Sequence, residues 1–252
     1  MGTDGRRFPQ RWLLRKPTGD APARLFCFPY SGCGASMYRD WPSRIGPAEV
    51  CLLQPPGRET RLREPHYGTY EALAEELVEF LRPYLDRPFA FFGHCSGALP
   101  GFETARQLAR CGLPGPARLF VSSQVAPQDG PYGRFLGMTD DELAPELQAL
   151  VAALGGQLHP SLLKLSLGVL RADVEANKRY RFAEPVRIPG AITVIGWKSD
   201  DEVAPALMEG WRHCANDVRF VLLDGVHYSF LQAPEALRDE IAADMERATP
   251  AT

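Results

Sequence analysis

The sequence lacks any long apolar run, and none reaches the roughly 18 residues of a membrane-spanning helix. The N-terminal segment has charges and prolines but no apolar core, so we expect no secretory signal. Lysine and arginine number 28 against 31 aspartate and glutamate residues, and the net charge of −3 does not favour nucleic acid or a membrane surface as a partner. We therefore expect a cytoplasmic protein.

The sequence also has no paired cysteines and no phosphate-binding motif. Its six cysteines include no Cys-x-x-Cys pair, so we expect reduced thiols and no metal site. A glycine-rich loop follows the first apolar run, but no Lys-Ser/Thr pair completes a P-loop and no G-x-G-x-x-G motif is present. We expect no cofactor bound by the chain itself.

What the sequence does contain is typical of an α/β protein. Its 252 residues, 45% apolar and 23% charged, can bury a full core, and we expect one domain over residues 1–252 and a monomer. Apolar runs alternate with helical patterns, which predicts a mostly parallel sheet with helices on both faces. The expected strands are 24–28, 50–53, 89–92, 117–121, 191–195 and 218–223, with 12–14 as a candidate edge strand; the expected helices are 69–85, 97–111, 205–215 and 235–247, the last with an apolar stripe of Leu237, Ile241 and Met245.

Residues 130–180 interrupt this alternation. Thr139 and Glu142 belong to a capping box that opens a helix running to about Leu154, and a second helical stretch covers residues 161–180. Two inserted helices predict a lid over the C-terminal edge of the sheet, where ligands bind in such folds. Ordinary crossover helices would explain the pattern equally well. The leucines that these helices would bury are Leu158, Leu162, Leu163, Leu165, Leu167 and Leu170.

The segment from Phe91 to Ala98 places Cys95 between two glycines, at the junction of an expected strand and an expected helix. This layout is that of a nucleophile elbow, a sharp turn that lifts one side chain above the sheet. Gly93 and Gly97 leave room for the turn, and the N-terminus of the following helix favours a thiolate or an oxyanion. The alternative is a glycine-bounded turn with a small buried cysteine.

A cysteine nucleophile needs a base, and the base needs a group that orients it. His227 and Asp200 each follow the end of an expected strand, where the fold would bring them to Cys95. The order Cys95, Asp200, His227 is that of α/β-hydrolases. Asp201 is a rival candidate for the acid. The alternative for the pair is structural: His227 would be a loop histidine bonded to backbone, and Asp200 a turn residue.

The other histidines lack such a placement. His94 precedes the nucleophile, and alternation along the elbow predicts that it points away and supports the turn by packing or hydrogen bonding. We expect His66, His159 and His213 to be surface or structural residues.

Acyl transfer also requires donors for the tetrahedral oxyanion. The backbone N–H of Ser96, directly after the nucleophile, is one expected donor. The second should come from the glycine-rich loop at residues 29–34, and we assign it to Ser31.

Five segments in the same order resemble one family. They read LFCFPYSGCGAS, QPPGRETRLRE, FFGHCSGALPGFETARQL, LRADVEANKRY and GVHYSF, and together they cover about residues 24 to 240. The chain resembles the type II thioesterases, stand-alone α/β-hydrolases that serve polyketide and nonribosomal peptide synthases. The resemblance implies a catalytic triad of Cys95, Asp200 and His227, oxyanion donors at Ser31 and Ser96, and a lid over residues 130–180.

The family usually has serine where this chain has Cys95. With cysteine, the acyl-enzyme is itself a thioester, close in energy to the phosphopantetheine thioester of a carrier protein. Hydrolysis of carrier-bound acyl or aminoacyl groups is the function that the resemblance implies, and transfer of the group between carriers or to an amine is the alternative. Two further hypotheses remain. A dienelactone-hydrolase-like enzyme is disfavoured by the family segments, and a non-catalytic carrier-binding module is disfavoured by the intact Asp200 and His227.

The implied partner is an acyl or peptidyl carrier protein with a phosphopantetheine arm. Because carriers are usually acidic, Arg58, Arg61 and Arg63 are a candidate docking patch. A solvated face balanced by Glu59 and Glu64 is the alternative.

Overall fold

The computed structural model describes residues 12–157 and 159–249. Its sheet has seven strands in the order β2-β3-β1-β4-β5-β6-β7, and every neighbouring pair is parallel except β2 and β3. The mostly parallel sheet expected from the alternation is confirmed. The strands are β1 Ala23–Phe28, β2 Arg44–Ile45, β3 Ala48–Leu52, β4 Phe89–His94, β5 Arg118–Ser122, β6 Ala191–Trp197 and β7 Asp217–Leu223.

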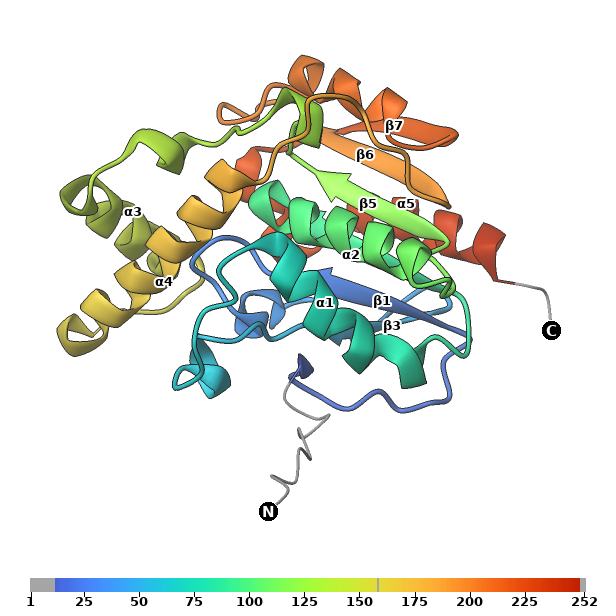
Figure 1. Cartoon of the computed structure of the whole chain (residues 1–252), viewed down its shortest axis with the longest axis horizontal. Coiled ribbons are helices and arrows are strands. Elements are labelled where there is room, and N and C mark those ends of the chain that lie inside the picture. The colour runs from blue at the N-terminus through green and yellow to red at the C-terminus, as the bar shows by residue number, and fades with distance from the viewer. Residues whose placement is uncertain (1–11, 158, 250–252) are drawn as a thin grey trace.

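Helices cover both faces of this sheet, as predicted. In Figure 1, α1 (Tyr70–Leu81) and α2 (Ala98–Arg110) lie side by side in front of the sheet, and α5 (Glu235–Ala248) lies behind it. The predicted stripe on α5 is fully buried, because Leu237, Ile241 and Met245 pack into the core on that face. Removing apolar surface of this kind from water is the main stabilising term of such a fold.

Three details differ from the sequence expectations. The strand β2 was not predicted, because two residues are too few to show a period. Residues 205–215 do not form an α-helix: Pro205–His213 is a 3₁₀-helix. The candidate edge strand is reduced to one antiparallel bridge, in which Leu13 pairs with Leu53.

The segment between β5 and β6 contains α3 (Asp140–Ala153) and α4 (Pro160–Arg179). Both lie beyond the end of the sheet towards which the arrows of β1 and β5 point (Figure 1). The carboxylate of Glu142 accepts a hydrogen bond from the backbone N–H of Thr139, as the capping box predicts.

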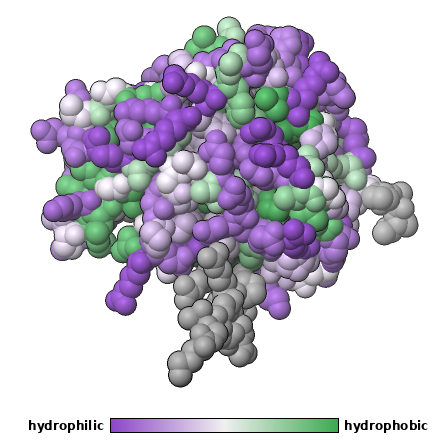
Figure 2. Space-filling view, viewed as in Figure 1, coloured by the Kyte–Doolittle hydropathy of each residue, from purple (hydrophilic) through white to green (hydrophobic). Residues whose placement is uncertain are grey.

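The leucines of this segment are only partly buried. Leu170 is inaccessible and packs in the same core cluster as Cys95, whereas Leu162 and Leu165 are 45% and 52% exposed. Figure 2 shows hydrophobic surface over the region of α3 and α4. Leu158 lies outside the described residues. In the part of the chain that is described, no helix is long and apolar enough to cross a membrane.

Candidate active site

Cys95 sits in a strained turn between β4 and α2. Its φ of +48° lies in the left-handed region that few non-glycine residues adopt. A Cβ on Gly93 would lie 2.3 Å from the carbonyl oxygen of Gly97, and one on Gly97 would lie 2.8 Å from that of Pro29. Both glycines are therefore required by the backbone, and the turn has the form of the predicted nucleophile elbow.

His227 and Asp200 meet beside this turn. His227 opens the short helix after β7 (His227–Gln232), and its Nδ1 lies 3.0 Å from both carboxylate oxygens of Asp200. The side chain of Cys95 also acts on the imidazole and raises its pKa. The structure therefore brings the three predicted residues together, although they are far apart in the sequence. Asp201, the rival acid, is exposed.

Hydrogen bonds hold the carboxylate of Asp200 in place. The hydroxyl of Ser123 donates to one oxygen at 2.6 Å, and the backbone N–H groups of Glu202 and Val203 donate to the other at 2.9 Å. Burial acts to raise the pKa of Asp200, but its hydrogen bonds with His227, Ser123 and Val203 and the charge of His227 outweigh burial, and the pKa is lowered. Asp200 is therefore an anion that orients His227. Ser123 was not predicted, although it directly follows β5.

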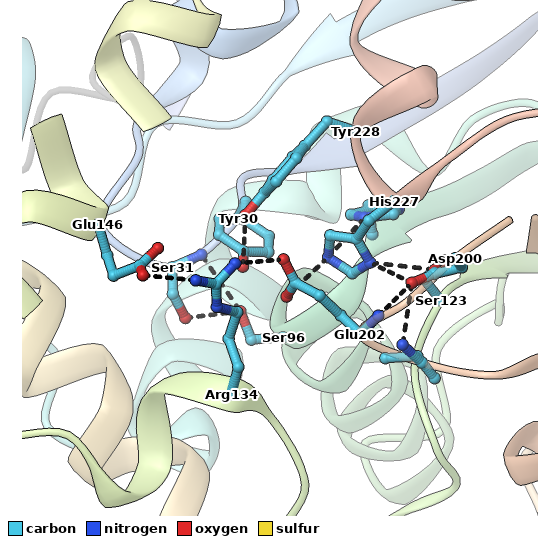
Figure 3. Close-up of polar contacts among 12 residues, drawn as sticks. Tyr30, Ser31, Ser96, Ser123, Arg134, Glu146, Asp200, Glu202, His227 and Tyr228 are labelled. Carbon is cyan, nitrogen blue, oxygen red and sulfur yellow. Dashed lines mark hydrogen bonds and ion pairs between the residues drawn. The ribbon is translucent and has the colours of Figure 1, made fainter. Parts of the chain in front are cut away.

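Glu202 is a second carboxylate at His227 that the sequence analysis missed. Its Oε2 lies 3.5 Å from Nε2 of His227, and its other oxygen lies 3.0 Å from Nη1 of Arg134. Arg134 in turn contacts Glu146 of α3 at 2.5 Å, and Figure 3 shows Arg134 between the two glutamates. The only signal in the sequence was the position of Glu202, two residues after Asp200.

The charge around His227 favours its protonated form. Burial alone would lower the pKa, but hydrogen bonds with Asp200 and Cys95 and the charges of Cys95 and Glu202 raise the pKa of His227 to about 10. A protonated imidazole beside Cys95 stabilises a thiolate at that position.

His94 supports the turn by packing and hydrogen bonding, as expected, but the expectation that it points away from the site is wrong. Its Nε2 lies 3.3 Å from Nε2 of His227, its Nδ1 lies 2.9 Å from the hydroxyl of Ser122, and its ring stacks on Phe230 at 3.8 Å. Alternation along β4 could not reveal this contact, because His227 arrives across the end of the strand from a distant segment. Burial and the charge of His227 hold the pKa of His94 well below its usual value, so this ring is neutral.

The two expected oxyanion donors are neighbours. The backbone N–H of Ser31 donates to the hydroxyl of Ser96 at 3.2 Å, and the two hydroxyl oxygens are 2.6 Å apart. In this structure the backbone N–H of Ser31 is therefore already hydrogen-bonded to the side chain of Ser96.

A buried ion pair ties α4 to the loop that carries Ser31. Arg58 makes a two-pronged contact with Asp173 of α4, at 2.8 and 2.9 Å. Asp173 also accepts the backbone N–H of Gly32 at 2.7 Å and contacts Nε2 of His66 at 2.7 Å. Three of the five sequence segments thus meet here, and His66 has a structural contact, as expected.

The predicted arginine docking patch is not supported. Arg58 and Arg61 are only 4% and 6% exposed, and Arg61 lies over the ring of Trp12 and pairs with Glu64 at 2.6 Å. Arg63 alone of the three is exposed. The neighbouring acids made this stretch look solvated, and the buried partner of Arg58 lies more than a hundred positions away in sequence.

Burial keeps other cysteines of the chain as neutral thiols. All six are free thiols, as expected, and Cys111 is the exposed one. Burial raises the pKa of Cys33, Cys51 and Cys214 to about 12, so these remain thiols at neutral pH. Within residues 12–157 and 159–249, no group of three His, Cys, Asp or Glu residues could hold a metal ion.

The fold and the turn at Cys95 define an α/β-hydrolase, and known proteins agree. The thioesterase domain family matches residues 23–248, so the chain belongs to that family. A probable cadicidin biosynthesis thioesterase of Streptomyces griseus is 34% identical over 247 residues, covering 96% of this chain and 68% of that protein. Linear gramicidin dehydrogenase LgrE of Brevibacillus parabrevis is 35% identical over 240 residues, covering 91% and 90%.

A solved structure is also similar. The RedJ thioesterase from the prodiginine biosynthetic pathway in Streptomyces coelicolor has a TM-score of 0.73 and 34% identity, and the match covers 89% of this chain and 86% of that one. The predicted α/β-hydrolase fold and thioester-hydrolase class are confirmed, and these relatives support the type II thioesterase class that the five segments indicate.

Proposed function

We propose that the chain removes acyl or aminoacyl groups from the phosphopantetheine thioester of a carrier protein in polyketide or nonribosomal peptide biosynthesis. The observation that carries the proposal is the contact of His227 with Asp200, beside the strained elbow that carries Cys95. Relatives named for cadicidin and prodiginine biosynthesis support the pathway class. The carrier supplies the phosphopantetheine, and the chain needs no cofactor of its own.

The triad provides each step of the acylation. Because Asp200 occupies Nδ1 of His227, we assign the proton exchange with Cys95 to Nε2. The thiolate of Cys95 attacks the carbonyl carbon, and the carrier thiol leaves with the proton that His227 returns. The N–H groups of Ser31 and Ser96 stabilise the oxyanion, which requires the hydroxyl of Ser96 to leave the N–H of Ser31 first.

Two kinds of acceptor can then remove the acyl group from Cys95. Water releases the free acid, and this hydrolysis is the activity of the family. A second thiol or an amine takes the acyl group by transfer, and cysteine favours this second function because the acyl-enzyme thioester is nearly isoenergetic with the carrier thioester.

The segment at 130–180 is proposed to act as a lid within a single domain. Residues of α3, of α4 and of the Ser31 loop line a common cavity of about 260 Å³, among them Cys33, Val151, Leu154 and Val169. This arrangement supports a substrate space that opens and closes at the helices.

The test is a mass measurement on protein incubated with an acyl-loaded carrier. A Cys111→Ser background removes the exposed thiol that could be acylated without catalysis. We expect one acyl group on Cys95 within the first turnovers. Binding of the carrier without any adduct, even at the shortest times, would instead identify a non-catalytic carrier-binding module.

A further inference from the structure

His227 has a carboxylate at each ring nitrogen. Asp200 contacts Nδ1 at 3.0 Å, and Glu202 reaches Nε2 at 3.5 Å, the nitrogen to which we assign the proton exchange with Cys95 (Figure 3). The triad described above needs only the first carboxylate, so Glu202 requires its own explanation.

Glu202 is held in this position from several sides. Its side chain is 9% exposed, and Arg134 binds Oε1 at 3.0 Å. Its backbone N–H donates to Asp200 at 2.9 Å, and the hydroxyl of Tyr132 donates to its carbonyl oxygen at 3.0 Å. The carboxylate is therefore a fixed part of the site and does not move freely in solvent.

Acylation removes one negative charge near His227, and the proton that His227 gives to the leaving thiol has to be regained from solvent. The acyl-enzyme has lost the negative charge of the Cys95 sulfur, whereas Asp200 and Glu202 keep theirs. The ionisable groups that face His227 are Cys95, Asp200, Glu202, His94, Tyr30 and Tyr228, with Arg134 behind Glu202.

The two possible acceptors depend differently on that proton. Water has a pKa of about 15.7 and reacts only if a neutral His227 removes its proton. A thiol with a pKa of about 8.5 loses its proton to solvent often enough to attack as a thiolate. A protonated His227 therefore slows hydrolysis much more than thiol attack.

We propose that Glu202 is a positioning residue that keeps a proton on Nε2 of His227 in the acyl-enzyme, so that the acyl group passes to a second thiol more readily than to water. This inference rests on the proposed acyl-Cys95 intermediate. The acceptor thiolate forms a new C–S bond to the carbonyl carbon, and the C–S bond to Cys95 breaks. Cys95 leaves with the electron pair as a thiolate beside protonated His227.

The experiment measures what fraction of the acyl group on Cys95 passes to water and what fraction passes to a second carrier. Cys95 is loaded from an acyl carrier, the donor is removed, and free acid and acylated carrier are followed with and without an empty second carrier. We expect Glu202→Gln to speed hydrolysis about tenfold for each unit by which the pKa of His227 falls. Thiol transfer should change much less, and the pH profile of hydrolysis should move to lower pH.

Asp201→Asn is the matched control, because it removes the same charge at an exposed position one residue away. It should divide the acyl group as the unmodified protein does. An unchanged division and pH profile in Glu202→Gln would overturn the proposal, and so would slower hydrolysis, which would make Glu202 a base for water. Absence of any adduct in the unmodified protein would overturn the proposed function itself.

A second measurement does not depend on loading by a carrier. Alkylation of Cys95 with iodoacetamide gives a neutral sulfur, as in the acyl-enzyme, and NMR can titrate His227 in that adduct. We expect His227 to hold its proton to higher pH than in the alkylated Glu202→Gln variant. Equal titration in the two adducts would refute the proposed role of Glu202.

Discussion

His227 is the residue at which the charges of the site meet, because Asp200 contacts its Nδ1 and Glu202 lies 3.5 Å from its Nε2. Cys95 and Asp200 could be placed from the sequence, because both follow recognisable strands and the ends of parallel strands share one edge. Glu202 and Ser123 could not be placed, because their contacts depend on loop conformation and rotamers. His94 was misplaced because alternation says nothing of a residue that arrives from elsewhere in the chain.

Substitutions at the triad should rank in a fixed order. His227→Ala removes the proton acceptor and should slow acylation of Cys95 by roughly 10²–10⁴-fold. Asp200→Asn should cost less, because a thiol ionises more readily than a hydroxyl and depends less on an oriented base. Single-turnover acylation measures both, with Asp201→Asn as the exposed control. A greater loss at Asp200 than at His227 would contradict these roles.

At the scale of elements, the elbow between β4 and α2 tolerates no side chain at its glycines. Gly93→Ala would place a Cβ 2.3 Å from the carbonyl oxygen of Gly97, which is backbone and cannot turn aside. We expect a protein that is strongly destabilised or fails to fold, measured by thermal unfolding. Gly168→Ala is the matched control: nothing lies within 4 Å of its Cβ inside α4, so it should stabilise by about 0.5–1 kcal/mol. A Gly93→Ala variant as stable as the unmodified protein would refute the strained turn.

The ion pair between Asp173 of α4 and Arg58 is the second test at this scale. Asp173→Asn leaves the buried charge of Arg58 unpaired, which costs about 3–5 kcal/mol. Because Asp173 also accepts the N–H of Gly32, acylation should slow as well. Denaturant unfolding and single-turnover acylation measure the two effects. Glu175→Gln, an exposed acid on the same helix, should change neither, and an Asp173→Asn variant of unchanged stability would contradict the pairing.

Among the elements, apolar runs predicted the strands correctly, whereas the charge pattern around Arg58 and Arg61 did not predict their burial. Six strands were predicted because each contains an apolar run, although β7 is only partly buried, whereas β2 has only two residues. Arg58 and Arg61 lie in a stretch with Glu59 and Glu64 that reads as a solvated face. Their burial depends on Asp173 and Trp12, and no local pattern encodes such distant partners.

For the whole molecule, the buried ionisable groups set the pH range in which the fold is most stable. Burial opposes ionisation of Asp173, but Arg58 and His66 outweigh it and hold the pKa of Asp173 below 3.8, and the pKa of Asp200 is also lowered from 3.8. Stability from these acids is present above about pH 3.8 and is lost as pH falls through their folded-state values. The pKa of His227 is raised from 6.5 to about 10, so its contribution is complete below pH 6.5 and is lost as pH rises towards 10.

All three contributions are complete together only between about pH 3.8 and 6.5, and we expect thermal stability to be highest in that range. Two variants test the alkaline and the acid side of this pH dependence of stability separately. His227→Gln should lose stability relative to the unmodified protein at neutral pH, and this difference should shrink as pH rises through about 10, because the unmodified protein then loses the same proton. Asp173→Asn should flatten the acid limb alone. A difference for His227→Gln that stays constant from pH 6.5 to 10 would mean that His227 is not protonated in the folded protein.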